Sequence, residues 1–156
     1  GRMSELSEEV KRLRSRVEEP TATAAKPAEE ATLREQYTTA FSDFKAGDYL
    51  KAVERFRSFV EKYPQSRLAD NAQYWIAESY LALRDYHRAL DEYRKVERNY
   101  PNGNRVPEAL LRSGQTLYAL EDIPGYVREL RRVIELFPRD PAAEVAARSI
   151  AELGAR

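Results

Sequence analysis

The sequence predicts an all-α protein built from stacked pairs of helices, on three observations. Similar segments begin at Asp48, Asp85 and Asp122, so the chain repeats with a period of 37 residues. A proline ends each segment, and apolar residues within the segments recur at helical spacing. A fixed period of this size is typical of supersecondary units that stack, because one unit cannot bury its apolar face alone.

The repeat units carry similar residue types in the same order, with one exception in the third unit. A small residue comes first, followed by a second small residue on the next helix, a large apolar residue and the closing proline. These residues are Ala40, Ala52, Phe56 and Pro64 in the first unit, Ala77, Ala89, Tyr93 and Pro101 in the second, and Gly114, Tyr126, Leu130 and Pro138 in the third. The small residues let two antiparallel helices approach closely. The order resembles the tetratricopeptide repeat, whose usual period is about 34 residues. We therefore expect a right-handed superhelix of three helix pairs plus a C-terminal capping helix.

Capping residues mark where these helices should begin. Asp48, Asp85 and Asp122 precede the second helix of each pair, and aspartate is a good N-cap. A final helix should begin after Asp140, with Pro141 in its first turn. Three apolar residues of this helix are available to cover the third pair, namely Val145, Ile150 and Leu153.

The third pair departs from the pattern of the other two. Tyr126 stands where the first two units have alanine, and its ring should push the helices apart or turn toward solvent with a shifted register. Gly125, next to it, is a weak helix former. We therefore expect the third pair to be the least regular of the three.

Two further segments precede the repeats, which occupy residues 32–156. Residues 1–19 read as a coiled-coil segment, because apolar residues recur at gaps of three and four. These are Met3, Leu6, Val10, Leu13 and Val17. Valine at a with leucine at d favours two strands. Residues 20–31 hold two prolines and small residues with no large apolar group, which predicts a flexible linker.

The composition excludes several functional classes. The 26 basic and 26 acidic residues cancel, so no electrostatic footprint for nucleic acid is present, and without cysteine there is no thiol chemistry. No apolar run approaches the roughly 18 residues of a membrane-spanning helix. His87, the sole histidine, is interpreted as a surface residue, and carboxylates such as Glu54, Glu61, Glu92 and Glu97 as a solvated face. We find no catalytic, metal or cofactor motif and expect no enzyme.

The surface expected to function is the concave wall formed by the first helix of each pair, where aromatic residues are prominent and could anchor a protein partner. The predicted binding residues are Arg34, Tyr37, Phe41 and Phe44 in the first unit, Asn71, Tyr74, Glu78 and Leu81 in the second, and Glu108, Leu111, Gln115 and Tyr118 in the third. Trp75 is assigned to the core.

Two stretches carry a more specific resemblance. "AFSDFKAGDYLKAVERFRSFVEKYPQS" and "NAQYWIAESYLALRDYHRAL" resemble the C-terminal domain of the Tol-Pal system protein YbgF family, also called the cell division coordinator CpoB family. The layout of the "LSEEVKRLRSRVEE" helix and the linker is similar too. The resemblance implies a periplasmic protein with a signal segment and a trimerising coiled coil. It also implies TolA as a partner, and a link between outer-membrane constriction and septal peptidoglycan synthesis, with a peptidoglycan synthase as a further partner.

Two other functions are compatible with such repeats. One is a scaffold subunit of an outer-membrane assembly machine, which would carry a lipidated cysteine upstream. The other is a cytosolic co-chaperone that clamps a terminal carboxylate with lysine, asparagine and arginine side chains. The positions of that clamp hold Tyr37, Phe41, Trp75, Glu108 and Arg112, and only Arg112 fits.

Overall fold

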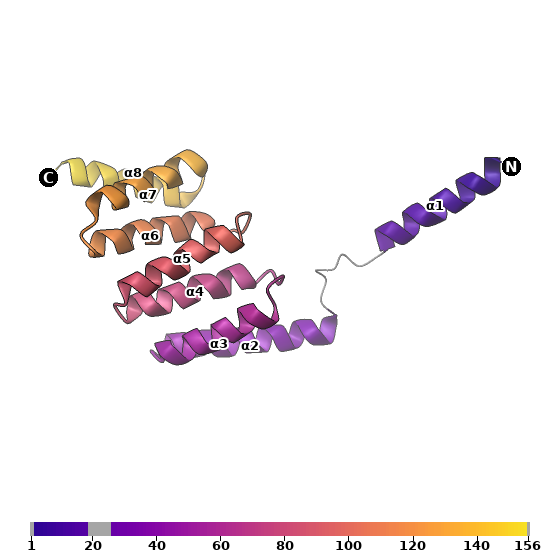
Figure 1. The fold of residues 1–156 in the computed structure, drawn as a ribbon, viewed down its shortest axis with the longest axis horizontal. Helices are drawn as coiled ribbons and strands as arrows, with labels where there is room; N and C mark the ends of the chain where they lie inside the picture. Colours follow the sequence, from indigo (N-terminus) through magenta and orange to yellow (C-terminus); the bar gives the residue numbers. More distant parts are fainter. Residues whose placement is uncertain (1, 19–25, 156) are drawn as a thin grey trace. The chain divides into compact units, whose positions relative to one another are not determined.

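The computed structural model describes residues 2–18 and 26–155, with side chains for 2–12 and 26–155. Within these ranges the chain forms eight helices and no strand (Figure 1). It divides into two compact units, Gly1–Ala31 and Thr32–Arg156. The first unit holds helix α1 (Arg2–Glu18). None of the described helices is both long and apolar enough to cross a membrane.

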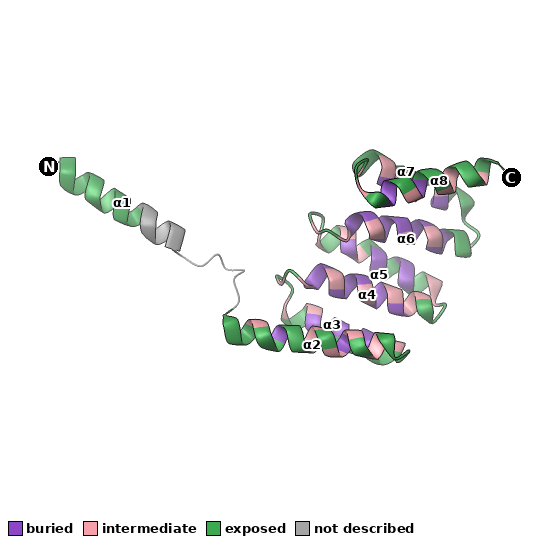
Figure 2. Ribbon diagram, turned by 180° about the vertical axis from the view of Figure 1, so that it is seen from behind, coloured by how far each residue is buried: buried purple, intermediate pink, exposed green. Residues whose placement is uncertain are grey.

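The second unit, which α2 enters at Thr32, is a stack of helix pairs, as the 37-residue period predicts. The pairs are α2 (Pro27–Lys45) with α3 (Tyr49–Lys62), α4 (Ala69–Ala82) with α5 (Tyr86–Asn99), and α6 (Val106–Ala119) with α7 (Ile123–Leu136). We call the first helix of each pair A and the second B. The B helices face the viewer in Figure 1, and the A helices are in front in Figure 2. Helix α8 (Pro141–Gly154) closes the stack against α7 and α6.

The core runs through the stack as two clusters of buried residues. The first joins α2, α3 and α4 around Phe56, Phe59 and Ile76, and the second extends from α4 to α8. Trp75 and Tyr80 pack against both clusters, so the apolar interior is continuous along the stack. Since each unit buries its side chains on its neighbours, stability comes from stacking.

The small residues of the repeat lie at the helix contacts, as expected from their spacing. Ala40, Ala52, Ala77 and Ala89 are all fully buried, each in the cluster of its own pair. A larger side chain at any of these positions would separate the two backbones or force strain on the surrounding core.

The predicted N-caps are confirmed at three of the four helices. The carboxylates of Asp85, Asp122 and Asp140 accept backbone hydrogen bonds from the first turns of α5, α7 and α8. Asp48 is the exception, because its side chain makes no capping bond. Its backbone carbonyl accepts the amide hydrogen of Ala52 at 2.9 Å, and α3 still begins directly after it.

The expectation that the third pair is irregular is wrong. Helices α6 and α7 have 14 residues each, the same length as α4 and α5. Tyr126 is buried, and its ring packs edge-on against Tyr118 with the centroids 5.0 Å apart. A Cβ atom added to Gly114 would lie 3.5 Å from the backbone oxygen of Tyr126. This is an ordinary van der Waals distance, so α6 and α7 pack at normal separation while the Tyr126 ring lies against Tyr118.

The start of α2 corrects the predicted linker. Residues 27–31 of the predicted linker are helical, because α2 begins at Pro27. Proline suits the first helical position, and Glu29 and Glu30 in the first turn complement the helix dipole. Residues 20–25 lie outside the described part of the chain.

Helix α8 covers the third pair, as predicted, although the tightest contacts come from other residues. Val145, Ile150 and Leu153 are half-buried and pack on the second cluster. The fully covered positions are the alanines Ala142, Ala143 and Ala146. Short side chains let α8 lie close to its neighbours, much as the alanines do within the first two pairs.

Candidate partner-binding surface

A row of aromatic rings joins the first two A helices. Phe41 and Phe44 of α2 stack with their centroids 6.2 Å apart, and Trp75 of α4 lies 4.9 Å from the first ring and 5.0 Å from the second. All three side chains are partly exposed. We call Phe41, Phe44 and Trp75 the aromatic row. Partly exposed rings that are fixed by their neighbours are suitable anchors for a partner, since little entropy is lost when they bind.

A cation extends the aromatic row toward the third pair. The Arg105 guanidinium lies 4.7 Å from the ring centroid of Tyr74 and 5.6 Å from that of Trp75. It donates hydrogen bonds to the Asn71 side chain and, at 2.7 Å, to a carboxylate oxygen of Glu108. Stacking on the rings and pairing with the carboxylate hold the cation in one place. The surface of the A helices therefore combines rings with a fixed positive charge.

A second polar group lies on the same helices. Glu78 accepts a hydrogen bond from the Tyr93 hydroxyl at 2.7 Å and pairs with Arg112 at 3.1 Å. Arg112 also donates to Gln115 at 3.3 Å. Burial, together with the nearby Glu78 carboxylate, raises the pKa of Tyr93 far above its ordinary value. Its hydroxyl thus stays protonated at any physiological pH, and the group provides fixed hydrogen bonds.

The structure places most of the predicted binding residues on the surface of the A helices. Ten are exposed or partly exposed, namely Arg34, Tyr37, Phe41, Phe44, Asn71, Glu78, Leu81, Glu108, Gln115 and Tyr118. Tyr74 and Leu111 are buried, at 2% and 8% exposure, so they support the surface from beneath and offer no contact area. The Tyr37 ring also turns inward, with Phe56 at 5.6 Å and Phe59 at 5.8 Å.

Sequence reasoning missed residues that contribute to this surface. Trp75 was expected in the core, and it does pack against both core clusters, but it is also partly exposed and lies at the centre of the aromatic row. Its residue type was the available signal, because tryptophan is enriched in binding sites. Arg105 was not predicted at all, since it lies in the turn before α6, where helical periodicity gives no information.

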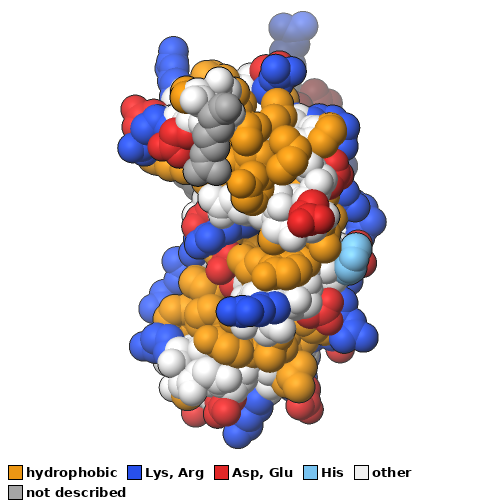
Figure 3. Space-filling model, turned by 90° about the vertical axis from the view of Figure 1, so that its left-hand side faces the viewer, with side chains coloured by type: hydrophobic (Ala, Val, Ile, Leu, Met, Phe, Trp, Pro, Cys, Tyr) orange, Lys and Arg blue, Asp and Glu red, His pale blue; other side chains and the backbone are white. Residues whose placement is uncertain are grey.

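The end of the stack where the A–B turns lie carries separate apolar areas (Figure 3). Leu50, Leu83 and Ile123 are exposed in or beside these turns. Charged and polar side chains separate the apolar areas in this view. Scattered apolar residues are normal on a protein surface, so they indicate no binding site. His87 is also exposed, in the first turn of α5. The described residues contain no group of acidic and histidine side chains that could hold a metal ion.

Comparison with known families identifies the class of protein. Two models of the tetratricopeptide repeat match residues 37–104 and 108–140. The first match begins within α2 and includes α3, α4 and α5, and the second includes most of α6 and all of α7. The chain is therefore a tetratricopeptide-repeat protein, and it belongs to a class of protein-interaction scaffolds.

Among curated proteins, the chain is similar to the cell division coordinator CpoB of Pseudomonas putida strain KT2440. The two are 40% identical over 55 residues, which is 35% of this chain and 20% of the relative. A second Pseudomonas putida CpoB sequence matches to the same extent. The similarity therefore spans about a fifth of the length of these relatives.

Solved structures share the fold at low sequence identity. PcrH in complex with the chaperone binding region of PopB has a TM-score of 0.64 and 21% identity, over 81% of this chain and 98% of that one. The first tetratricopeptide domain of Spaghetti bound to an HSP90 peptide has a TM-score of 0.62 and 19% identity, over 80% and 94%. These likenesses show the fold alone.

Proposed function

We propose that this protein is a non-enzymatic adaptor that binds a segment of a protein partner on its A helices. The observation that carries the proposal is the aromatic row with Arg105 beside it. Each ring is held by neighbouring rings, and the cation is held by Glu108 and Asn71. Such a surface offers apolar anchors next to charged hydrogen-bond donors, which suits a segment with both apolar and polar side chains.

The similarity to CpoB supports a more specific role. We infer that the protein acts in the periplasm as part of the Tol-Pal system and binds TolA. In that role it coordinates outer-membrane constriction with septal peptidoglycan synthesis during cell division, with a peptidoglycan synthase as a second partner. The support is the 40% identity over 55 residues, together with the tetratricopeptide matches at residues 37–104 and 108–140.

The binding proposal is tested by titrating TolA against variants of the aromatic row. Phe41→Ala is expected to weaken binding by about 30-fold, because the loss of an anchor ring commonly costs about 2 kcal/mol or more. Tyr63→Ala is the matched control, since Tyr63 is also partly exposed and contacts a single ring, Phe59, at the end of a B helix. Calorimetry at a temperature where all variants are folded measures the affinities.

The wild-type chain offers a second readout. Trp75 is its only tryptophan, so a TolA segment without tryptophan should change the emission of a single known residue when it binds. Equal affinities for Phe41→Ala, Tyr63→Ala and the wild type would contradict the proposal and place the binding surface away from the A helices. TolA that binds without any change in Trp75 emission would argue against contact with the aromatic row.

We also propose that the N-terminal helix joins copies of the chain. Met3, Leu6 and Val10 are 86%, 62% and 49% exposed on α1, and their spacing places them along one side of the helix. An apolar stripe of this kind is typical of a coiled-coil seam. The same seam is predicted to continue through Leu13 and Val17, whose side chains lie outside the described ones.

Sedimentation of the whole chain tests the self-association. The double variant Leu6→Asp/Val10→Asp is expected to shift the protein to the monomer, because charges at the seam would be buried without a partner. Lys11→Asp is the control, since Lys11 falls outside the a and d positions and is exposed. A seam variant that sediments like the wild type, or a control that dissociates equally, would show that α1 does not hold the copies together.

A further inference from the structure

Charged side chains link successive B helices across the stack. Between the first two pairs, Arg57 of α3 donates to Glu92 of α5 at 2.9 Å. The Glu92 carboxylate is buried, and it also accepts from Lys95 at 3.1 Å and from Gln73 at 2.7 Å. This group satisfies both oxygens of the carboxylate and gives Arg57 a partner in the next unit.

The equivalent link between the second and third pairs is made differently. The 37-residue period maps Arg57 onto Arg94 and Glu92 onto Glu129. In the structure Glu129 pairs instead with Arg132, at 3.2 Å, and the same arginine reaches across to Glu97 at 2.7 Å. Arg132 therefore supplies the ion pair that links α5 and α7, and Arg94 takes no part in this link.

Two arginines on α5, Arg94 and Arg98, are free. Across the ranges that the structure describes, neither Arg94 nor Arg98 forms a hydrogen bond, an ion pair or a ring contact. Both side chains are exposed, and they lie one helical turn apart on the same face of α5. Like charges at this spacing repel each other and destabilise the helix, so an anion bound between them would relieve the repulsion.

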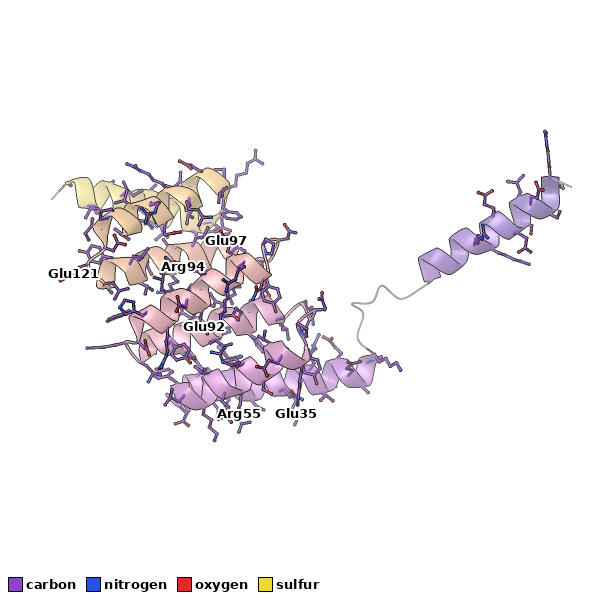
Figure 4. All side chains as sticks on the ribbon, viewed as in Figure 1. Glu35, Arg55, Glu92, Arg94, Glu97 and Glu121 are labelled. Atoms are coloured by element: carbon purple, nitrogen blue, oxygen red, sulfur yellow. The ribbon has the colours of Figure 1, made fainter. Side chains whose placement is uncertain are left out.

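Open grooves lie on either side of these two arginines. One, of about 580 Å³, runs between α3 and α5, and the other, of about 260 Å³, lies between α5 and α7. Arg94 and Arg98 line both grooves. Figure 4 labels Arg94 between Glu92 and Glu97 along α5, seen from the side of the B helices. Those two carboxylates are already paired, as described above.

The larger groove is positively charged within a chain whose net charge is zero. Five arginine and lysine side chains line it against two acidic ones, Asp91 and Glu92. Glu92 is engaged by Arg57 and Lys95, and Asp91 forms no pair with either free arginine. The local excess of positive charge therefore remains available to a ligand.

We propose that Arg94, Arg98 and the adjoining groove form a second docking site, which takes an acidic segment of a protein partner. A guanidinium group binds a carboxylate through two parallel hydrogen bonds, and two guanidinium groups one turn apart fit two acidic side chains of one segment. The site lies on the B helices, opposite the surface of the aromatic row, so one chain could hold two partner segments at once. The proposal does not depend on the identity of the A-helix partner.

A labelled, end-blocked hexaglutamate peptide tests this site by fluorescence anisotropy. We expect saturable binding at low ionic strength that weakens as salt is added, because exposed charges are screened. Arg94→Gln/Arg98→Gln is expected to lower the affinity at least tenfold. Arg131→Gln is the matched control, since Arg131 holds the same repeat position on α7, is exposed and lines neither groove. It should leave the affinity unchanged.

Several results would overturn the proposal. One is an equal loss of affinity in Arg131→Gln, which would indicate diffuse charge attraction. The others are an unchanged affinity in the double variant and no saturable binding of the peptide. Arginine-dependent binding of phosphatidylglycerol vesicles without binding of hexaglutamate would assign the groove to a lipid surface. Phe41→Ala should leave peptide affinity unchanged, which separates this site from the aromatic row.

Discussion

Tyr74→Ala is expected to lower the free energy of unfolding by about 3–5 kcal/mol, as for other large side chains deleted from a core. Tyr74 is 2% exposed, and its ring packs 5.4 Å from Trp75 and 5.9 Å from Tyr93. Alanine would leave a cavity between α4 and its neighbours and remove the ring under Arg105. Urea denaturation followed by circular dichroism measures the change.

Tyr74→Phe is the matched control for this prediction. It keeps the ring and removes only the hydroxyl, which donates to Glu108 at 2.9 Å, so a loss of about 1 kcal/mol is expected. A loss of less than about 1 kcal/mol for Tyr74→Ala would contradict the buried position of the ring. Tyr74 would then belong with the exposed anchors, as its place on an A helix first indicated.

Glu92→Gln is expected to cost about 3 kcal/mol, the upper range for hydrogen bonds to a buried charged group. The substitution keeps the shape of the side chain but removes the charge that faces Arg57 and Lys95. Glu61→Gln is the control, because Glu61 is an exposed carboxylate on a B helix and its loss should cost almost nothing. Urea denaturation at neutral pH gives both values.

The pH dependence gives an independent check on Glu92. Burial alone would raise the pKa of this carboxyl, but hydrogen bonds from Arg57, Gln73 and Lys95 outweigh burial and hold the pKa below its ordinary value of 4.5. A carboxyl with a lowered pKa stabilises the fold above its ordinary pKa, and that stabilisation is lost as the pH falls through the lowered value. The difference between wild type and Glu92→Gln should thus be constant near neutral pH and shrink below about pH 4.5. A difference that grows with acidification would contradict this origin.

The number and order of the repeat helices could be predicted from the sequence, because they depend on local signals. Prolines end the B helices, aspartates begin them, and small residues recur where the backbones meet. The early start of α2 was missed, because the segment offers nothing large to bury and its helix is favoured only by Pro27 and the acidic residues that follow.

The details of the surface depend on contacts that no local pattern reveals. Tyr74 and Trp75 are neighbours on one helix, and the angle between α4 and α2 decides which ring is buried. Glu92 was interpreted as part of a solvated face and is buried, because Arg57, 35 residues earlier in the chain, reaches it from the preceding unit. Residues this far apart in the sequence come into contact only when the units stack, so no local sequence pattern predicts the pair.

Helix α8 has a consequence for how such an array can lengthen by tandem duplication. Its covered side holds alanines and a few larger apolar residues, whereas Glu144, Arg148 and Glu152 are exposed on its other side. A new unit placed against that side would have to take these charges out of water without partners, which is costly. A copied 37-residue unit could instead be inserted before Pro141, where each unit already presents an apolar face to the next. Tandem duplication is thus expected to add units before α8 in the sequence, with α8 itself unchanged.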